Sequence, residues 1–317
     1  MPDHPSPASD LPLLAVPNVS EGRDSATIEA IAQAFTGQSG ARLLDVHSDA
    51  DHHRSVFTLA ASQGQLPGAL LAGARVAVER IDVGATRDPA DVGQHPHVGA
   101  VDVMPIVYLD LAQRGAACAQ ALVVASELGE DLGVPVLLYG ALAGERTRAE
   151  LRRGGVAGLA QRLSAGELRP DFGPPRLHPT AGATLVAARE PLVAFNVELA
   201  APADVHDAKR IAGLIREGGP EGLPGVRAIG VALRDGNTEQ GRNTEQDESV
   251  AQVSTNVERP LEVPLRTVVE AVARHAQVAC AELVGLAPRA ALEGFPAEVA
   301  LRNFDPGVHT IENALGF

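Results

Sequence analysis

The sequence predicts an α+β fold, because short strand patterns and amphipathic helix patterns follow one another as β-α-β-β-α-β and the order then recurs in the second half. Hydrophobic residues make up 45% of the 317 residues and charged residues 21%, as in proteins with a packed core. The Pro- and Gly-rich segment Arg169–Pro175 marks a break between the halves. We therefore expect a disordered leader at 1–12 and two subdomains, at 13–180 and 181–317, each an open mixed sheet with helices on one face.

The first half begins with an apolar strand at 13–16, which ends at Pro17. Ser20–Ser25 supplies turn and N-cap residues for a helix in which Ile28, Ile31 and Phe35 have the 3,4 spacing of a buried face. The elements expected next are strands at 43–46 and 54–60, a helix at 66–79, a strand at 101–108, a helix at 113–132 and a buried strand at 134–139. Residues 140–179, in which the pattern weakens, read as the segment between the domains.

The second half repeats the element order more loosely. It predicts paired strands at 185–188 and 192–199, a helix at 203–216, a second strand pair at 226–233 and 251–257, a helix at 264–276 and a strand at 280–283. The tetrapeptide Asn237–Gln240 returns as Asn243–Gln246. Because this repeat is polar, it favours a mobile hairpin loop without a chemical role.

Charge and composition exclude several classes of protein. The net charge is −14 and aromatic residues make up 3% of the chain, which argues against a nucleic-acid partner. The sequence shows no signal peptide and no apolar run without charge that is long enough to span a membrane. We therefore expect a cytoplasmic protein without a membrane partner. Cys118 and Cys280 give no disulfide framework. Lys209 is the one lysine, so positive charge depends on arginine.

Five of the ten histidines lie in two short polar segments, His47–His53 and His95–His97. Histidine suits proton transfer near neutral pH, which makes these segments candidates for acid–base catalysis. A solvated polar loop is the alternative, and a metal site is another, since His and Asp are common ligands of Zn²⁺ and related ions. The spacing does not decide between them. Arg54, Arg176 and Arg189 lie near this cluster or near Pro/Gly breaks, where a guanidinium could hold a carboxylate.

Several blocks of the sequence, in order, resemble the glutamate formiminotransferases. The blocks are Val16–Gly22, Leu43–Val46, Asp51–Thr58, His95–Val103, Val134–Gly140, Pro170–Pro174, Gly182–Thr184, Ala194–Val197, Ala251–Asn256 and Glu282–Leu286. The resemblance covers about residues 13 to 315, and several blocks in order over the whole chain are far more specific than any single motif. The chain resembles the stand-alone form of the transferase, which has no cyclodeaminase region, rather than the bifunctional form.

The resemblance implies a fold and a reaction. The fold is two ferredoxin-like subdomains packed sheet to sheet with helices outside. The reaction is transfer of the formimino group from N-formimino-L-glutamate to tetrahydrofolate in histidine degradation and one-carbon metabolism. Tetrahydrofolate acts as co-substrate, no metal is expected, and the family commonly forms homodimers.

The resemblance also assigns roles to residues of this chain. His95 is the expected general acid and base. The expected substrate-binding residues are Asp45, His53, Arg54, Ser55, His97, Gly99 and Asn196. The expected folate-binding stretch is Gly173, Pro174, Pro175, Arg176, Leu177, His178, Pro179, Thr180, Ala181 and Gly182.

The chain departs from the family pattern at positions that bear on substrate. His97 replaces an arginine, which removes a permanent charge and a forked donor. Thr180-Ala181-Gly182 stands where the family has Ser-Trp-Gly, so an aromatic surface is missing. His53 replaces an asparagine, and Asp91 replaces a histidine of the vertebrate pattern.

Two alternatives to the folate-dependent transferase therefore stay open. One is a metal-dependent hydrolase or transferase of the same fold that uses His47, Asp49, His53, His95 and His97. The other is a non-catalytic relative that binds folate or an amino-acid derivative without turnover.

Overall fold

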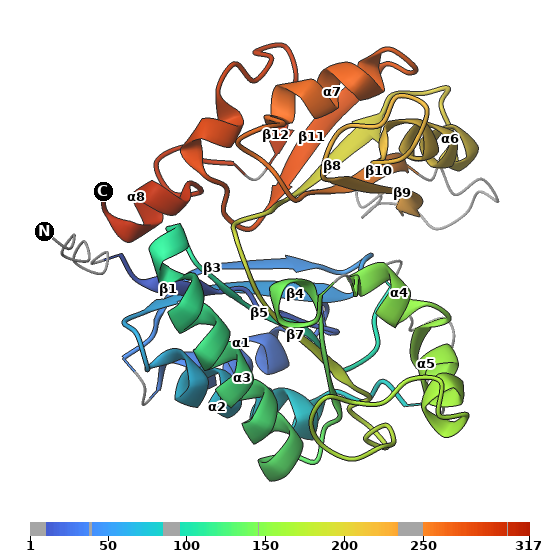
Figure 1. The fold of residues 1–317 in the computed structure, drawn as a ribbon. Helices are drawn as coiled ribbons and strands as arrows, with labels where there is room; N and C mark the ends of the chain where they lie inside the picture. Colours follow the sequence, from blue (N-terminus) through green and yellow to red (C-terminus); the bar gives the residue numbers. More distant parts are fainter. Residues whose placement is uncertain (1–10, 38–39, 85–95, 145, 234–249, 303) are drawn as a thin grey trace, which may run out of the picture. The chain divides into compact units, whose positions relative to one another are not determined.

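The structure is a computed structural model, and it describes residues 11–37, 40–84, 96–144, 146–233, 250–302 and 304–317 (Figure 1). Most of the expected leader, the repeated tetrapeptide, Asp91 and His95 lie outside these residues. The chain divides into two compact units, Met1–Glu190 and Pro191–Phe317. The division falls at residue 190 rather than at the expected residue 180, because the strand Thr184–Arg189 belongs to the sheet of the first unit.

The first unit contains a β-α-β-β-α-β core. Its elements are β1 (Leu13–Ala15), β2 (Asn18–Val19), α1 (Ser25–Thr36), β3 (Arg42–Asp49), β4 (Arg54–Ala61), α2 (Leu66–Arg80) and β5 (Val101–Val107). Strands β1 and β2 both pair antiparallel with β4 and β5, so they occupy one strand position interrupted around Pro17. The order β3, β4, β1 and β2, β5 is that of a ferredoxin-like sheet.

A helical crossover extends this sheet. The chain continues through a 3₁₀ turn, η2 (Leu111–Gln113), α3 (Arg114–Asp131), β6 (Val136–Leu138) and η3 (Gly140–Leu142). After α4 (Arg148–Arg152) and α5 (Gly155–Ser164) it returns as β7 (Thr184–Arg189). Strand β7 lies between β5 and β6 and is parallel to both.

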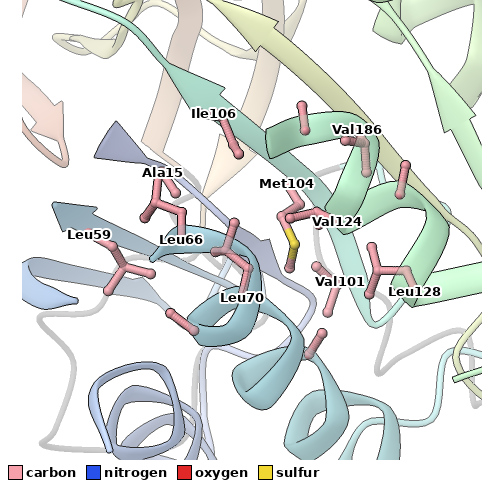
Figure 2. Packing of buried hydrophobic residues seen from close by; sticks show 14 of the residues in the cluster. Ala15, Leu59, Leu66, Leu70, Val101, Met104, Ile106, Val124, Leu128 and Val186 are labelled. Atoms are coloured by element: carbon pink, nitrogen blue, oxygen red, sulfur yellow. The ribbon is translucent and has the colours of Figure 1, made fainter. Parts of the chain in front are cut away.

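Helices α1, α2 and α3 cover one face of the first sheet. Their core residues, among them Leu66, Leu70 and Leu128, are fully buried in one cluster with strand residues such as Met104 (Figure 2). Each large apolar side chain of this kind contributes about 1.5–3 kcal/mol to folding. Because strand side chains alternate, the same strands also present apolar residues to the other face.

Helices α4 and α5 pack on that opposite face. Leu151, Leu159 and Leu163 join a separate core with strand residues that include Val103 and Leu185. The expectation that residues 140–179 form an inter-domain segment was therefore wrong. Glycines at 154, 155 and 158 interrupt the helical pattern in the sequence, although tertiary packing still supports both helices.

The second unit repeats the ferredoxin-like topology. Its elements are β8 (Val193–Leu199), α6 (Val205–Ile215), β9 (Val226–Leu233), β10 (Val250–Val257), α7 (Leu265–Ala273), β11 (Val278–Val284), η4 (Arg289–Leu292), β12 (Leu301–Arg302) and α8 (Ile311–Leu315). The strand order is β12-β11-β8-β10-β9, with β12 added at the edge. Side chains of α6 and α7, such as Ile211 and Val268, pack on one face of this sheet.

The predicted α+β class and the two ferredoxin-like subdomains are confirmed by these topologies. The predicted pairing of 226–233 with 251–257 is also confirmed, whereas the pairing of 185–188 with 192–199 is wrong. Strands β7 and β8 belong to different sheets. Packing of the two units sheet to sheet stays a prediction. Across the described residues, the helices are too short or too polar to cross a membrane.

Candidate active site

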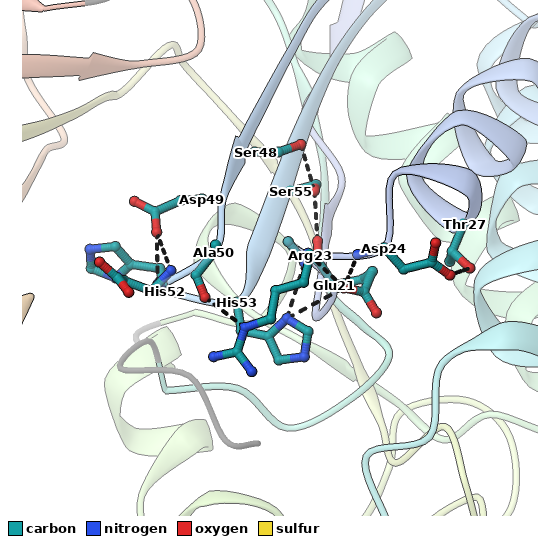
Figure 3. A network of polar contacts seen from close by, with 12 residues as sticks. Glu21, Arg23, Asp24, Thr27, Ser48, Asp49, Ala50, His52, His53 and Ser55 are labelled. Atoms are coloured by element: carbon teal, nitrogen blue, oxygen red, sulfur yellow. Dashed lines mark hydrogen bonds and ion pairs between the residues drawn. The ribbon is translucent and has the colours of Figure 1, made fainter. Parts of the chain in front are cut away.

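The β3–β4 turn places His53 beside the start of α1 (Figure 3). Asp49 Oδ1 accepts hydrogen bonds from the backbone N–H groups of Asp51 and His52, both at 2.8 Å, and so shapes the turn. His53 then adopts a left-handed conformation with φ 49° and is buried. This backbone is unusual for a residue other than glycine, and it directs the imidazole toward Gly22.

The contacts of His53 Nδ1 define the tautomer of the ring. The Gly22 N–H donates to Nδ1 at 3.1 Å, so this nitrogen accepts and the neutral ring carries its proton on Nε2. Glu21 Oε1 lies 3.5 Å from the same nitrogen. The site therefore holds a histidine next to a carboxylate, a pair suited to acid–base chemistry.

The carboxylate of Glu21 is itself held by backbone. Its Oε1 accepts from the N–H groups of Arg23 at 2.8 Å and Asp24 at 3.0 Å, just before α1. Asp24 caps α1, and the Thr27 hydroxyl, which donates to it at 2.6 Å, lowers the pKa of Asp24 below its ordinary value. The lead-in to α1 is thus a rigid support for Glu21.

The predicted residues on β4 lie on two different faces. Ser55 shares the helix-covered face with Phe57 and is fully buried. Its hydroxyl donates to Glu21 O at 2.6 Å, so in the 2.8 Å contact between the two hydroxyls Ser48 must be the donor. Ser55 therefore links β4 to the lead-in of α1 through the backbone of Glu21.

Arg54 and Asp45 lie together on the opposite face. Arg54 pairs in register with Asp49, and Asp45 pairs with Thr58, four residues along β4. Residues 54, 56 and 58 point to the same face of the sheet, since every second residue of a strand does so. The side chains of Arg54 and Asp45 therefore leave the sheet on the face away from α1 and α2. The structure thus brings an arginine and a carboxylate to one sheet face.

The segment after His95 crosses the predicted folate stretch. Gly99 and Gly182 form an antiparallel bridge, with hydrogen bonds of 2.9 Å from Ala100 N to Ala181 O and from Ala183 N to Val98 O. A Cβ on Gly99 would lie 1.9 Å from Ala183 O, and Gly182 has φ 67°. Both positions require glycine. The structure therefore joins the His97 segment, where His97 is half-buried, to the 173–182 loop.

The 173–182 loop is folded back on itself. His178 and Gly182 exchange both backbone hydrogen bonds, and the Ala181 N–H donates to His178 Nδ1 at 3.0 Å. Arg176 is exposed, together with Gly173, Pro175 and Pro179, whereas Leu177 packs on the α4–α5 core. Ala181 is 1% exposed and belongs to the α1–α3 core, so its side chain faces protein. His178 Nδ1 therefore stabilises the turn at 178–182 by accepting the hydrogen bond from the Ala181 N–H.

Asn196 lies in the second unit, on the face of β8 away from α6 and α7. It is buried, and its amide donates to Glu282 Oε2 at 3.1 Å. On the same face Glu198 forms an ion pair with Arg302 and accepts from Cys280 Sγ at 3.1 Å. Burial, followed by the charge of Glu282, raises the pKa of the Cys280 thiol.

The sequence reasoning missed several buried polar residues. Glu282 lies in one of the family blocks, which was a signal that it is functional. Asp102 and Arg152 form an ion pair beside the His97 segment, with the two side chains 3% and 13% exposed. An aspartate within the apolar run of β5 was a signal for Asp102, although not for its partner.

A metal centre is the remaining alternative from the sequence. Within the described ranges, no group of three or more His, Cys, Asp or Glu side chains has the arrangement of a metal site. His95, one of the proposed ligands, lies outside those ranges.

The chain is similar to known formiminotransferases along nearly its whole length. The model of the formiminotransferase domain, N-terminal subdomain, matches residues 13–189. Glutamate formimidoyltransferase of Streptococcus pyogenes serotype M1 is 33% identical over 309 residues, which cover 95% of this chain and 97% of the relative. The Thermoplasma acidophilum protein of the same name is 32% identical over 92% of this chain and 93% of its own.

Bifunctional relatives match as well. Formimidoyltransferase-cyclodeaminase of Gallus gallus is 36% identical over 290 residues, 87% of this chain but 50% of the relative. The chain thus spans about half the length of the formimidoyltransferase-cyclodeaminase. It spans nearly the whole length of the two relatives named glutamate formimidoyltransferase.

Proposed function

The chain belongs to the formiminotransferase family, and we propose that it is a glutamate formimidoyltransferase, which moves the formimino group of N-formimino-L-glutamate to tetrahydrofolate. The products are 5-formiminotetrahydrofolate and glutamate. The similarity to two relatives named glutamate formimidoyltransferase over more than nine-tenths of the chain supports this proposal. The observation that carries it in the structure is the crossing of Gly99 and Gly182, because it brings the segment assigned to catalysis against the loop assigned to folate.

The reaction requires proton transfer at two nitrogens. Folate N5 attacks the amidine carbon, the new N5–C bond forms, and N5 loses its proton. The bond between that carbon and the glutamate nitrogen then breaks, and this nitrogen gains a proton. One imidazole can accept the first proton and donate the second, and we assign this role to His95.

Binding of the donor requires positive charge for its two carboxylates. Arg54 supplies a guanidinium on the face that it shares with Asp45, and a planar guanidinium holds a carboxylate in two-pronged fashion. His53, Ser55, His97, Gly99 and Asn196 complete the proposed substrate set. Ser55 acts through the backbone of Glu21, since its side chain is fully buried.

Tetrahydrofolate is the proposed co-substrate, and the 173–182 loop is its proposed binding segment. The exposed members of the loop, Arg176 above all, are suited to the anionic tail of folate. The family further suggests a role in histidine degradation and one-carbon metabolism, a homodimer, and a cytoplasmic location.

A direct assay tests the function. Protein purified without a His tag is mixed with formiminoglutamate and tetrahydrofolate, and 5-formiminotetrahydrofolate is followed optically. We expect turnover without added metal and no stoichiometric metal in the purified protein. Folate binding by calorimetry without turnover at any pH would instead indicate a non-catalytic relative, and stoichiometric Zn²⁺ or Mn²⁺ would indicate the metal-dependent alternative.

A further inference from the structure

The backbone of Val98–Ala100 is held from two sides. On one side it bonds to the end of the 173–182 loop, as described above. On the other side Ser20, which follows β2, donates its hydroxyl to Gly99 O at 2.7 Å and its N–H to Ala100 O at 2.9 Å. These contacts use backbone groups and one small hydroxyl, so they fix the strand crossing without a charged group.

A charged pair completes the set. Asp102 Oδ1 accepts from the Val98 N–H at 2.8 Å, and Asp102 Oδ2 forms an ion pair with Arg152 Nη2. Asp102 belongs to β5 and is 2% exposed, whereas Arg152 is the last residue of α4. The pair thus connects α4, through the second residue of β5, to the backbone next to His97.

Stability alone does not account for this pair. Removing two charges from water costs several kcal/mol for each ion, and a buried ion pair is often no more stable than apolar residues of similar volume. Leu151 precedes Arg152 and Val103 follows Asp102, and both pack in the α4–α5 core. An apolar pair lacks, however, an acceptor for the Val98 N–H.

We propose that Asp102 is a positioning residue for the transfer reaction and that Arg152 is the counter-charge of its buried carboxylate. An oxygen of the Asp102 side chain fixes the backbone at Val98, beside His97 and three residues after His95 in the sequence. The inference rests on the proposed function, because the segment is the one assigned to catalysis. Displacement of a catalytic segment by about 1 Å costs about 100-fold in rate, so Asp102 acts on kcat more than on KM.

Two variants separate positioning from stability. Asp102→Leu with Arg152→Met replaces the ion pair by apolar residues of similar volume. We expect it to fold with a Tm close to that of the wild type, because the gain from removing two buried charges offsets the loss of the acceptor for the Val98 N–H. We expect kcat to fall about 100-fold and the KM of each substrate to change less than about threefold. Asp102→Asn keeps an oxygen for the Val98 N–H but leaves Arg152 without its counter-charge. We expect a lower Tm with kcat within about threefold of wild type.

A stability control and a direct structural readout complete the test. Val268→Ala removes two methyl groups from a fully buried side chain of α7 in the second unit, and we expect it to lower Tm and leave kcat unchanged. Hydrogen exchange of the peptide 96–101 should be faster in the double variant and unchanged in Val268→Ala. This measurement does not depend on activity.

The outcomes are distinct. Failure of the wild type to transfer a formimino group contradicts the proposed function, and the exchange measurement then decides on the positioning role. With an active wild type, a folded double variant that keeps its kcat and its slow exchange overturns the inference. So does an Asp102→Asn protein whose kcat falls about 100-fold, since it retains the acceptor. The kcat of Asp102→Asn decides on the inference even if the double variant does not fold.

Discussion

Gly22 is the residue that lets the α1 lead-in approach the β3–β4 turn. A Cβ at this position would lie 2.1 Å from Asp49 O and 2.6 Å from Arg54 N, closer than side-chain carbons approach backbone. The same close approach allows the Gly22 N–H to reach His53 Nδ1. The geometry of the His53–Glu21 pair therefore depends on a residue that has no side chain.

Replacement of Gly22 by alanine should reduce both stability and activity. We expect the free energy of unfolding to fall by about 1–3 kcal/mol, because backbone of β3 and β4 must move to admit the methyl group. Urea unfolding measures the loss. Gly68→Ala is the matched control, since no atom lies within 4 Å of its added Cβ within α2. It should be neutral or stabilise by up to about 1 kcal/mol. Equal stabilities of the two variants would contradict the steric argument.

His95→Ala should remove the proposed proton shuttle. General acid–base catalysis contributes about 10²–10⁴-fold, so we expect kcat to fall by that factor at pH 7 while folding is retained. Steady-state kinetics and circular dichroism check the two parts. His206→Ala, at an exposed position of α6, serves as the control and should keep the wild-type kcat. Normal turnover by a folded His95→Ala protein would exclude the assignment.

At the scale of elements, the sequence predicts most helices and strands because apolar periodicity reports burial directly. The apolar positions Ile31 and Phe35 of α1 are indeed fully buried. The pairing of β7 with β5 is different: two neighbouring strands with a short turn resemble a hairpin, and the partner of a parallel strand is distant in sequence. Long-range pairing of this kind leaves no local signal.

The family blocks marked part of the candidate site. Gly99, Gly173, Pro174 and Gly182 lie in these blocks, and Gly99 meets Gly182 in the structure, whereas the roles that the resemblance assigns to them stay predictions. The Asp102–Arg152 pair was not predictable, because its members lie fifty residues apart on a strand and a helix that the sequence did not connect. Ser55 was expected at the substrate, yet alternation along β4 places it on the helix-covered face.

Asp171 anchors the chain just before the proposed folate loop. Asp171 Oδ2 accepts from the Leu138 N–H at 2.8 Å, and both carboxylate oxygens accept from Arg146 Nη2, at 2.8 and 2.9 Å. These bonds attach the start of the loop to β6. We expect Asp171→Ala to raise the KM for tetrahydrofolate about tenfold and to leave the KM for formiminoglutamate unchanged, because only the loop is released.

The control for this prediction is an ion pair of similar length elsewhere. Asp207→Ala removes the exposed contact between Asp207 and Arg210 on α6, at 3.0 Å, and should change neither KM. Steady-state kinetics with each substrate varied in turn measures both values. A parallel rise of both KM values in Asp171→Ala would show that the anchor serves the whole site rather than the loop.

At the scale of the whole molecule, the charge distribution opposes the proposed substrates. The net charge is −14, and several arginines are neutralised by carboxylates. Examples are Arg146 with Asp171, Arg152 with Asp102 and Arg274 with Glu221. The field that holds a dicarboxylate must therefore be local and must come from arginine, because Lys209 is the one lysine.

Ionic strength should separate the long-range field from the local contact. Raising salt from about 10 mM to about 150 mM shortens the screening length from about 30 Å to about 8 Å. Repulsion between the chain and the anionic donor acts over the longer distance and is screened, whereas a guanidinium–carboxylate contact within the site is screened much less. We expect kcat/KM for formiminoglutamate to rise about threefold to tenfold over this range, with kcat constant.

Arg54→Ala should lower kcat/KM at every salt concentration and preserve the rise of kcat/KM with salt. A kcat/KM that falls steeply with salt in the wild type would mean instead that a cluster of arginines attracts the donor from a distance, and that the surface near the site is positive despite the charge of the chain.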